Sequence, residues 1–269
     1  MRKPTPIPGI PVGGDKRPLI GMIHPAPLPG SPRYAGDVRK ILDSALRDAE
    51  ALAAGGASAI MLENFGDLPF YPGRVPAHVI ASMTAIACAV RRTVDLPLGI
   101  NVLRNDGQSA LAVALASGAQ FIRVNVLCGA RVTDQGVING IAHDLLRDRA
   151  QLGAQSIAIF ADVDVKHSAP LAARPLEDEV EDTVERGLVD ALIVSGSGTG
   201  KKTDPAHARL VKTIRPNVPV LIGSGASAES VKNYLPHADG FIVGTAIKID
   251  GKVENAVDAN RVRKLAAAL

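Results

Sequence analysis

The sequence predicts an α/β fold, a (β/α)8 TIM barrel built as one domain over residues 18–269. From Pro18 onward, short apolar runs alternate with longer helical patterns, and this unit occurs eight times. Such alternation implies parallel strands joined by right-handed crossovers, and eight units close into a barrel more naturally than they form an open sheet. The chain of 269 residues is 46% hydrophobic, which is enough for one large core. Barrels of this length are commonly single domains.

The expected strands are the apolar runs at 18–24, 57–64, 97–103, 120–126, 156–165, 191–196, 219–225 and 240–247. Helices are expected near 37–54, 76–93, 108–117, 140–153, 176–187, 206–215, 226–235 and 254–268. Several strands follow a Gly-Ala turn, as in GGASAI, SGAQFI and LGAQSI, because glycine readily ends the preceding helix. Residues 1–17 form a Pro/Gly-rich extension before the first strand.

Composition excludes several classes of protein. The net charge is +3, from 30 basic and 27 acidic residues, and no basic run exceeds a pair, so a nucleic-acid partner is not expected. Only 3% of residues are aromatic, which argues against a base-stacking surface. No run reaches the roughly 18 apolar residues of a membrane span, and the N-terminus lacks a signal-peptide pattern. With two cysteines, the chain fits a reducing cytoplasm and no direct insertion into a membrane.

The stretch ADVDVKHSAPL, residues 161–171, ends the fifth expected strand with Asp162, Asp164 and Lys166 at alternate positions and His167 directly after. Since side chains alternate along a strand, the first three are expected on one face, at the barrel end where TIM barrels carry their active sites. A structural ion-pair network is the alternative reading. A lysine held charged could deliver a proton or clamp an anion, and one in drier surroundings could attack a carbonyl; both stay open.

Polar residues also end the other strands. The candidate catalytic residues are Lys166, Asp162, Asp164, Glu63, His24 and His167, and the candidate substrate-binding residues are Asn101, Arg123, Asn125, Ser195 and Ser197. Charged groups placed inside a barrel need partners, since an unpaired buried charge costs several kcal/mol. A single histidine is more often a hydrogen-bonded structural residue than a catalyst or ligand. No HxH or HExxH spacing occurs, so no metal ligands are predicted.

Glycine-rich loops in the second half predict a phosphate site. IGSGAS, residues 222–227, follows the seventh expected strand and VGTAIK, residues 243–248, closes the eighth. The loops after these two strands are the usual phosphate-binding loops of this fold, and glycine lets backbone N–H groups approach an anion. The expected donors are Gly223, Ser224, Gly225, Gly244 and Thr245. The alternative is that both loops are tight turns without a ligand.

Three further loops invite interpretation. SGSGTGKKTD, residues 195–204, lacks the spacing of a nucleotide-binding GxxxxGK[ST] loop, and its glycines suit a mobile lid. HPAPLPGSPRY at 24–34 and NFGDLPFYPGRVP at 64–76 are long for this fold. They are interpreted as lids or binding loops, or equally as caps of the barrel or subunit contacts.

Several motifs in order resemble the BtpA/SgcQ family. They are GMIHPAPLPGSPRY, LENFGDLPF, GINVLRND, FIRVNV and ADVDVKHS, and the resemblance covers nearly the whole chain from about Pro18. It implies a barrel of the ribulose-phosphate-binding type. The family is named after a cyanobacterial protein needed for accumulation of the photosystem I reaction centre, while other members occur in bacteria and archaea without photosynthesis, some beside sugar-metabolism genes. The family implies no settled reaction.

Two functions follow as expectations. The first is an enzyme acting on a small phosphorylated sugar or nucleoside-like substrate, by isomerisation, aldol-type cleavage or glycosidic-bond chemistry. The second is a noncatalytic biogenesis factor for a membrane complex. The first is favoured because a scaffold does not need charged groups converging inside a barrel. A small phosphorylated ligand and a homo-oligomer are expected, and the cofactor is unknown, with magnesium left open.

Overall fold

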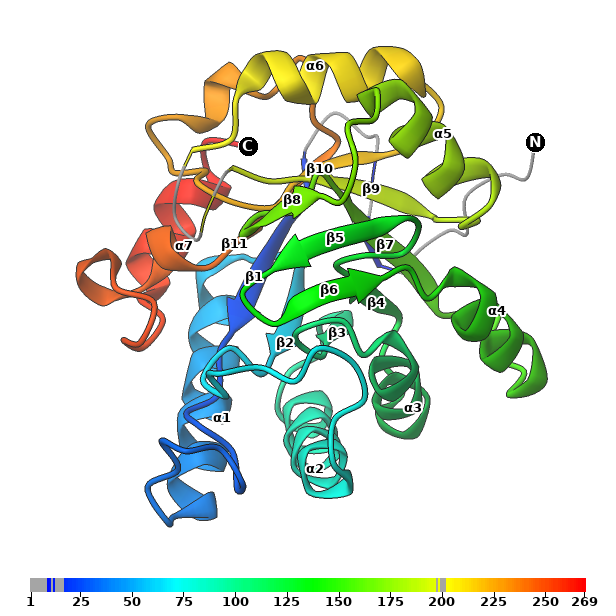
Figure 1. Cartoon of the computed structure of the whole chain (residues 1–269). Helices are drawn as coiled ribbons and strands as arrows, with labels where there is room; N and C mark the ends of the chain where they lie inside the picture. Colours follow the sequence, from blue (N-terminus) through cyan, green and yellow to red (C-terminus); the bar gives the residue numbers. More distant parts are fainter. Residues whose placement is uncertain (1–8, 11, 13–16, 197, 199–201) are drawn as a thin grey trace.

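The computed structural model describes residues 9–10, 12, 17–196, 198 and 202–269. Eight parallel strands form a closed barrel in the spatial order β1-β11-β10-β9-β7-β4-β3-β2, with helices around it (Figure 1). The strands are β1 (Leu19–Ile23), β2 (Ala59–Glu63), β3 (Leu98–Asn101), β4 (Phe121–Val124), β7 (Ala158–Val163), β9 (Ala191–Val194), β10 (Val220–Ile222) and β11 (Gly240–Val243). The predicted (β/α)8 barrel is thereby confirmed.

The helices lie between these strands and after β11. They are α1 (Val38–Gly55), α2 (Ala77–Thr93), α3 (Gly107–Ser117), α4 (Ala142–Gln151), α5 (Leu176–Glu185), α6 (Pro205–Ile214) and α7 (Ala259–Ala266), with short 3-10 turns at η1 (Val231–Asn233), η2 (Thr245–Ile247) and η3 (Ile249–Gly251). Asp37 caps α1 by accepting the N–H of Lys40. Gly56 in the left-handed region ends α1, as the GGASAI pattern predicts.

The prediction of a helix at 226–235 is wrong, because only the 3-10 turn η1 forms there. The Ser230 hydroxyl accepts the N–H of Ser227 at 3.0 Å, and the Ser227 hydroxyl accepts the N–H of Ser230 at 3.3 Å. Such side-chain to backbone bonds offer the chain an alternative to helical hydrogen bonds. The compact turn that results keeps the loop after β10 close to the barrel.

A small antiparallel sheet that the sequence pattern did not predict lies in front of the barrel in Figure 1. The loop after β4 folds into a hairpin of β5 (Ala130–Thr133) and β6 (Gly136–Asn139), and the loop after β7 adds β8 (Ser168–Pro170) beside β5. The sheet joins the loops of two neighbouring barrel strands. It therefore fixes the chain just beyond Asp162 and Lys166.

One face of every barrel strand points inward. The inward apolar residues are Ile20, Met22, Ala59, Met61, Phe121, Ala158, Phe160, Ala191, Ile193, Leu221 and Ile242. Phe121 and Phe160 stack at 4.7 Å between ring centroids. Gly99 makes room for them, since a Cβ there would lie 2.1 Å from the ring of Phe121. The barrel interior is thus a packed core rather than a pore.

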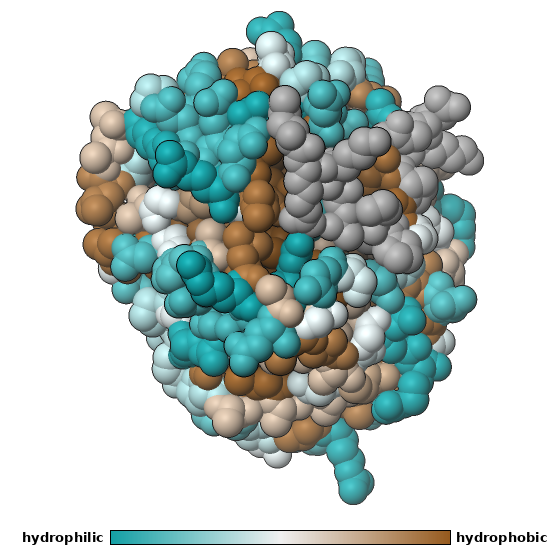
Figure 2. Space-filling model, turned by 90° about the vertical axis from the view of Figure 1, so that its right-hand side faces the viewer, coloured by the Kyte–Doolittle hydropathy of each residue, from teal (hydrophilic) through white to brown (hydrophobic). Residues whose placement is uncertain are grey.

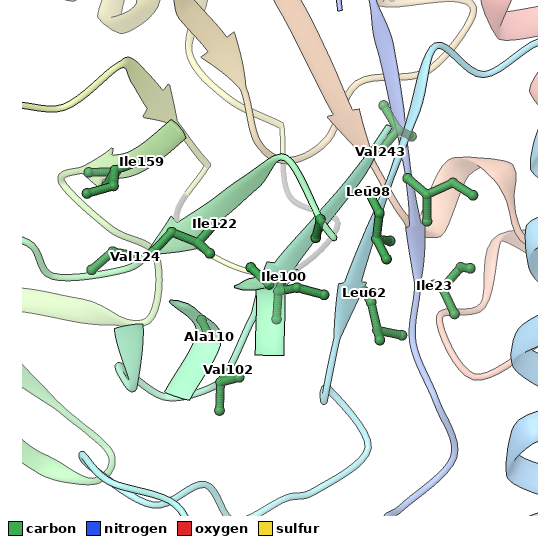
Figure 3. Packing of buried hydrophobic residues seen from close by; sticks show 14 of the residues in the cluster. Ile23, Leu62, Leu98, Ile100, Val102, Ala110, Ile122, Val124, Ile159 and Val243 are labelled. Atoms are coloured by element: carbon green, nitrogen blue, oxygen red, sulfur yellow. The ribbon is translucent and has the colours of Figure 1, made fainter. Parts of the chain in front are cut away.

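The opposite strand faces pack against the helices. Figure 3 shows Ile23, Leu62, Ile100, Ile122, Ile159 and Val243 among the buried residues of this larger cluster. Its members alternate along each strand with the inward residues, as a period of two requires. The two clusters explain why the strands read as continuous apolar runs in the sequence.

Part of the N-terminal extension belongs to the barrel core. Ile10 is buried with the inward cluster, and Val12 packs against it. A Cβ on Gly9 would lie 2.9 Å from the ring of Pro97, directly before β3, so this segment lies at the N-terminal end of the barrel. Residues 1–8, 11 and 13–16 are outside the described residues.

Among the described residues, no helix is both long and apolar enough to cross a membrane. On the face shown in Figure 2, hydrophilic residues cover broad areas and hydrophobic ones lie between them.

Substituting Gly99 by alanine tests the packing of the barrel interior. Because the new Cβ would meet the ring of Phe121, we expect a loss of about 1–3 kcal/mol in the free energy of unfolding. Gly73, whose added Cβ would meet nothing within 4 Å, is the control, and Gly73→Ala should change stability by less than about 1 kcal/mol. Urea unfolding measures both, and equal effects would contradict this packing.

Candidate functional site

The innermost polar layer of the barrel lies at the C-terminal ends of the strands. It continues the inward-facing positions by two residues: His24 after β1, Glu63 on β2, Asn101 on β3, Arg123 on β4, Asp162 on β7, Ser195 after β9, Gly223 after β10 and Gly244 after β11. Below this layer every inward side chain is apolar or absent. These residues converge at the C-terminal end of the barrel, as the sequence predicts.

Arg123 and Asp162 form a buried ion pair at the centre of the layer. The guanidinium donates from Nε and Nη2 to the two carboxylate oxygens, each at 2.8 Å, and both side chains are at most 2% exposed. Burial alone would lower the pKa of Arg123, but the facing Asp162 carboxylate raises it. Ser195 Oγ at 3.2 Å and Asn125 Nδ2 at 3.3 Å complete the hydrogen bonds that Asp162 accepts. Asp162 therefore orients Arg123 and has little capacity left for substrate.

Glu63 and His24 form a second pair, with 3.4 Å between Oε1 and Nε2. Burial alone would raise the pKa of Glu63, but the hydrogen bond from His24 and the positive charges of Arg123 and Lys166 lower it to about 2. Burial lowers the pKa of His24. At neutral pH the pair is thus a carboxylate and a neutral imidazole.

The pairing also fixes which nitrogen of His24 carries the proton. Since Nε2 faces Glu63, the proton lies there, and the buried Nδ1 is left as an acceptor. It has no hydrogen-bond partner among the described residues. A ligand hydroxyl is the kind of group that this atom can accept from.

Asn101 links β3 to β4. Its amide donates to the carbonyl of Arg123 at 2.9 Å and to Oδ1 of Asn125 at 3.2 Å. Its own Oδ1 is buried and unpartnered within the described part of the chain. Asn101 therefore offers a second free acceptor beside the central ion pair.

Lys166 lies in the loop after β7 and borders two cavities. Burial lowers the pKa of its amine, and the nearby charge of Arg123 lowers it further, against the opposing effect of Glu63 and Asp162. Both factors favour the neutral amine, which can act as a base or a nucleophile. Of the two roles that the sequence left open for Lys166, the lowered pKa favours the amine that acts as a base or nucleophile over the charged proton donor or anion clamp.

Asp164 does not share the face of Asp162, so the expected alternation is wrong beyond Val163. The strand ends at Val163, and Asp164 turns away with φ of 50° and a side chain that is 51% exposed. Its carboxylate pairs with Arg131, and its N–H donates to Glu179 at 2.8 Å. Asp164 thus fixes the small sheet to α5, outside both cavities described below.

His167 also follows the strand end, with φ of 56°. His167 is exposed to solvent, and it lines the second cavity together with Lys166. It lies at the rim of the site rather than in its polar layer.

The first cavity has a volume of about 240 Å³ and lies between the central charges and the last two barrel loops. All five predicted phosphate-binding residues, Gly223, Ser224, Gly225, Gly244 and Thr245, line it together with His24, Glu63, Arg123, Lys166 and Lys202. The structure therefore brings the residues predicted from the loops after β10 and β11 together at one cavity. Arg123, Lys166 and Lys202 border this cavity with groups that can attract an anion, beside the carboxylate of Glu63.

Gly223 has a different role from the one expected. Its N–H already donates to the carbonyl of Val194 at 2.8 Å, so it is not available to an anion. A Cβ there would lie 2.5 Å from Ile193 Cγ2 and 2.8 Å from Ser195 Oγ. Gly223 is required because it leaves space, whereas Gly225, with φ of 71°, turns the loop.

The loop after β9 is hydrogen-bonded to the loop after β10, which lines the first cavity. The Thr203 hydroxyl donates to the carbonyl of Ser224 at 2.9 Å, and the Tyr234 hydroxyl donates to the carbonyl of Thr203 at 2.8 Å. Ser197 and residues 199–201 lie outside the described residues, so the predicted substrate contact of Ser197 and the predicted lid remain predictions.

The second cavity adjoins the first across Glu63, Phe65 and Lys166, and its volume is about 330 Å³. Its other lining residues are Leu68, Phe70, Leu103, Arg104, Asn125, Asp134 and His167. The sequence analysis missed Arg104 and Asp134. Asp134 stands at the tip of the unpredicted β5–β6 hairpin. Arg104 lies in the GINVLRND motif, after the end of β3, and was not counted among the polar residues that end the strands.

The two long loops are bound to each other. Asp67 accepts the N–H of Leu28 at 2.7 Å and the amide of Asn64 at 3.1 Å, and Asn64 accepts the N–H of Leu103 at 2.7 Å. A Cβ on Gly66 would lie 2.7 Å from the carbonyl of Pro25. These contacts hold Phe65 over the site, 5.0 Å from the ring of His24. The loops act as a fixed wall in this structure.

Within the ranges that the structure describes, no three His, Cys, Asp or Glu side chains gather closely enough to hold an ion. The cationic residues around the first cavity suit an anion directly.

A closed (β/α)8 barrel with glycine-lined loops after its last two strands and buried charges between them places the chain among the TIM barrels with a site at the C-terminal ends of the strands. The BtpA family model matches residues 15–269, and the chain belongs to this family. The resemblance noted in the sequence is thereby confirmed.

Relatives in the family are close over nearly their full length. An uncharacterized protein of Thermococcus kodakarensis is 51% identical over 93% of this chain and 94% of its own. The photosystem I biogenesis protein BtpA of Synechocystis is 44% identical over 94% of this chain and 88% of its own. Among solved structures, N-(5'-phosphoribosyl)anthranilate isomerase of Pyrococcus furiosus matches with a TM-score of 0.57 at 12% identity, over 94% of this chain and 98% of its own. At that identity the likeness shows the fold.

Asp162 and Asp164 should differ sharply when each is changed to asparagine. Asp162→Asn leaves the Arg123 guanidinium buried without a counter-charge, and we expect it to destabilise the fold by about 3–5 kcal/mol. Asp164→Asn removes a half-exposed carboxylate, and the buried Arg131 keeps Glu179 as a partner, so the expected loss is about 1 kcal/mol or less. Chemical denaturation measures both, and a reversed order would contradict this assignment.

The Glu63 carboxylate should make stability depend on acid pH. Its pKa is lowered from 4.5 to about 2 in the folded state, so its contribution is complete above about pH 4.5 and is lost as the pH falls toward 2. The full contribution corresponds to about 3 kcal/mol. Comparison of the wild type with Glu63→Gln between pH 7 and pH 3 should show the stability difference shrinking only below about pH 4.5. A difference that stays constant with pH would overturn the assignment.

Proposed function

We propose that the protein is an enzyme that binds a small phosphorylated sugar or nucleoside-like substrate and transforms it at Lys166. The observation that carries the proposal is the meeting of two cavities at one amine. The first cavity offers the glycine loops, and the second has room for the rest of a substrate. Lys166 and Glu63 border both.

Phosphate binding is supported by the loops after β10 and β11. Gly225, Gly244 and Thr245 place backbone groups along one side of the first cavity, and Arg123 and Lys202 add positive charge to its border. This combination is how TIM barrels commonly hold a phosphate. The solved barrel of P. furiosus that this fold resembles is named for a phosphoribosyl compound, which agrees with the proposal.

Lys166 is proposed as the central catalytic group because it borders both cavities and because burial lowers the pKa of its amine. A neutral amine can remove a proton next to a carbonyl, as isomerases require, or add to the carbonyl carbon, as some lyases require. Arg123, fixed by Asp162, is placed to polarise or hold an oxygen of the substrate. Asn101 and Asn125 are proposed to orient substrate hydroxyls, and Ser195 supports Asp162.

His24 and Glu63 are proposed as a second acid–base group. The neutral imidazole can take a proton at Nδ1, and the carboxylate at Nε2 would stabilise the resulting imidazolium. Two groups whose environments favour different protonation states can serve as donor and acceptor in one reaction. Asp164 is left out of this machinery, since its carboxylate pairs with Arg131 of the small sheet.

A noncatalytic role is the second candidate, and the name of the Synechocystis relative favours it. The protein would then use the same barrel to support the biogenesis of a membrane complex. A cytoplasmic homo-oligomer is proposed under either function.

Substitution of Lys166 separates the two functions. The unfolding temperature of the wild type should rise in the presence of ribose 5-phosphate or inorganic phosphate. A ligand at about 100 times its Kd adds about 2.7 kcal/mol to the free energy of unfolding. Lys166→Ala should keep the response to inorganic phosphate and lose conversion of phosphorylated compounds, followed by phosphorus NMR over a panel of sugar and nucleoside phosphates.

Gly244→Val is the matched variant for the phosphate loops. Its side chain would enter the first cavity near His24, and we expect the phosphate response to disappear. A wild type that responds to no phosphorylated compound would contradict the proposed function and leave the noncatalytic role.

A further inference from the structure

Arg104 differs from the other buried arginines. Four arginines are buried among the described residues. Three of them have a carboxylate at close range: Arg123 has Asp162 at 2.8 Å, Arg131 has Glu179 at 3.2 Å, and Arg149 has Asp190 at 3.3 Å. Arg104 is 4% exposed and has no carboxylate partner within the described part of the chain. A buried guanidinium without a counter-charge is costly unless something else supplies one.

The side chain of Arg104 borders the second cavity. Its Nη2 donates to the carbonyl of Lys166 at 2.6 Å, which uses one of the five N–H groups of the guanidinium. Burial lowers its pKa, and Asp162, Asp134 and Glu63 act on it only through longer-range attraction. The guanidinium remains charged and has further donors beside a cavity of about 330 Å³.

The remaining wall of this cavity is largely apolar. Phe65, Leu68, Phe70 and Leu103 line it, and the rings of Phe65 and Phe70 lie 6.3 Å apart. Flat apolar groups pack well against such rings. Asp134 and His167, both exposed, stand at the rim. The cavity therefore combines two aromatic rings, tilted 55° to each other, with the charge of Arg104, which has no carboxylate within ion-pair distance among the described residues. The carboxylates of Glu63 and Asp134 also line the cavity and act on Arg104 at longer range.

We propose that the second cavity binds a planar, apolar part of the substrate that carries a carboxylate, with Arg104 as its counter-charge. A carboxylate matches the two-pronged geometry of a guanidinium, and the pair is strong when it is shielded from water. The proposal rests on the proposed function, because it names the substrate class of the same site: a phosphate ester with a second, carboxylated end. A plain sugar phosphate leaves Arg104 without a partner.

Benzoate and benzamide test the second cavity by itself. They have the same ring and shape, and only benzoate carries the negative charge. Calorimetric titration of the whole chain, in saturating inorganic phosphate, should show benzoate binding at least about tenfold more tightly than benzamide, as a charge-assisted hydrogen-bonded pair implies. Equal affinities, or tighter binding of benzamide, would overturn the inference.

Variants locate the effect. Arg104→Gln should reduce benzoate binding to the level of benzamide, and Phe70→Ala should weaken both compounds alike. Asp134→Asn removes an exposed carboxylate at the rim and should tighten benzoate about two- to threefold without changing benzamide. This variant keeps the inference testable if Arg104→Gln does not fold. A benzoate preference that persists in folded Arg104→Gln and is insensitive to Asp134→Asn would place the charge elsewhere and refute the proposal.

The phosphate response separates this inference from the proposed function. If inorganic phosphate stabilises the wild type and Arg104→Gln alike while benzoate fails, the phosphate site stands and the carboxylate site is refuted. If benzoate binds through Arg104 while phosphate has no effect, the second cavity is an anion site but the proposed phosphorylated substrate is wrong.

Discussion

The buried ion pair of Arg123 and Asp162 is the constraint on which the polar layer of the barrel depends. Neither charge is tolerable there alone, and their two hydrogen bonds leave the remaining carboxylate positions to Ser195 and Asn125. The residue at position 223 lies against the same group, because an added Cβ would be 3.6 Å from Arg123 Nη2 and closer still to Ser195. The charge of Arg123 also lowers the pKa of Lys166. One pair therefore sets the shape and the chemistry around it.

The site divides protonation between two groups of opposite character. Around Glu63, a hydrogen bond from His24 and nearby cations lower the pKa to about 2 although burial opposes this. Around Lys166, burial and Arg123 favour the uncharged amine. Burial alone would raise the pKa of Glu63, and the pKa of a lysine in water is higher than that of Lys166 in this site. Such a separation is what a barrel needs to accept a proton at one point and stabilise charge at another.

The sequence predicted the barrel and most of its polar layer, because strand side chains alternate with a fixed period and the inward positions could be counted to the strand ends. The alternation of side chains ends with the strand, and the positions beyond it differ from those expected. Asp164 follows Val163 with a left-handed φ, which no local pattern announced. The hairpin that brings Asp134 to the site depends on pairing with β8, more than thirty residues later. Arg104 could not be singled out because its distinguishing feature, a buried guanidinium with no carboxylate partner among the residues that the structure describes, depends on the folded chain.

The position of Lys166 depends on these same nonlocal contacts. The lysine lies beyond the strand, so the barrel ladder does not fix it; instead Arg104 holds its carbonyl at 2.6 Å, and the small sheet holds the residues that follow. Arg131 contributes by bonding Ser168 Oγ at 2.9 Å. A group bound by the remaining donors of Arg104 would therefore act on the side chain that also orients the Lys166 loop. Occupancy of the second cavity and placement of the amine are linked through one guanidinium, so binding energy from the distant end of a substrate could be used to align the reacting group.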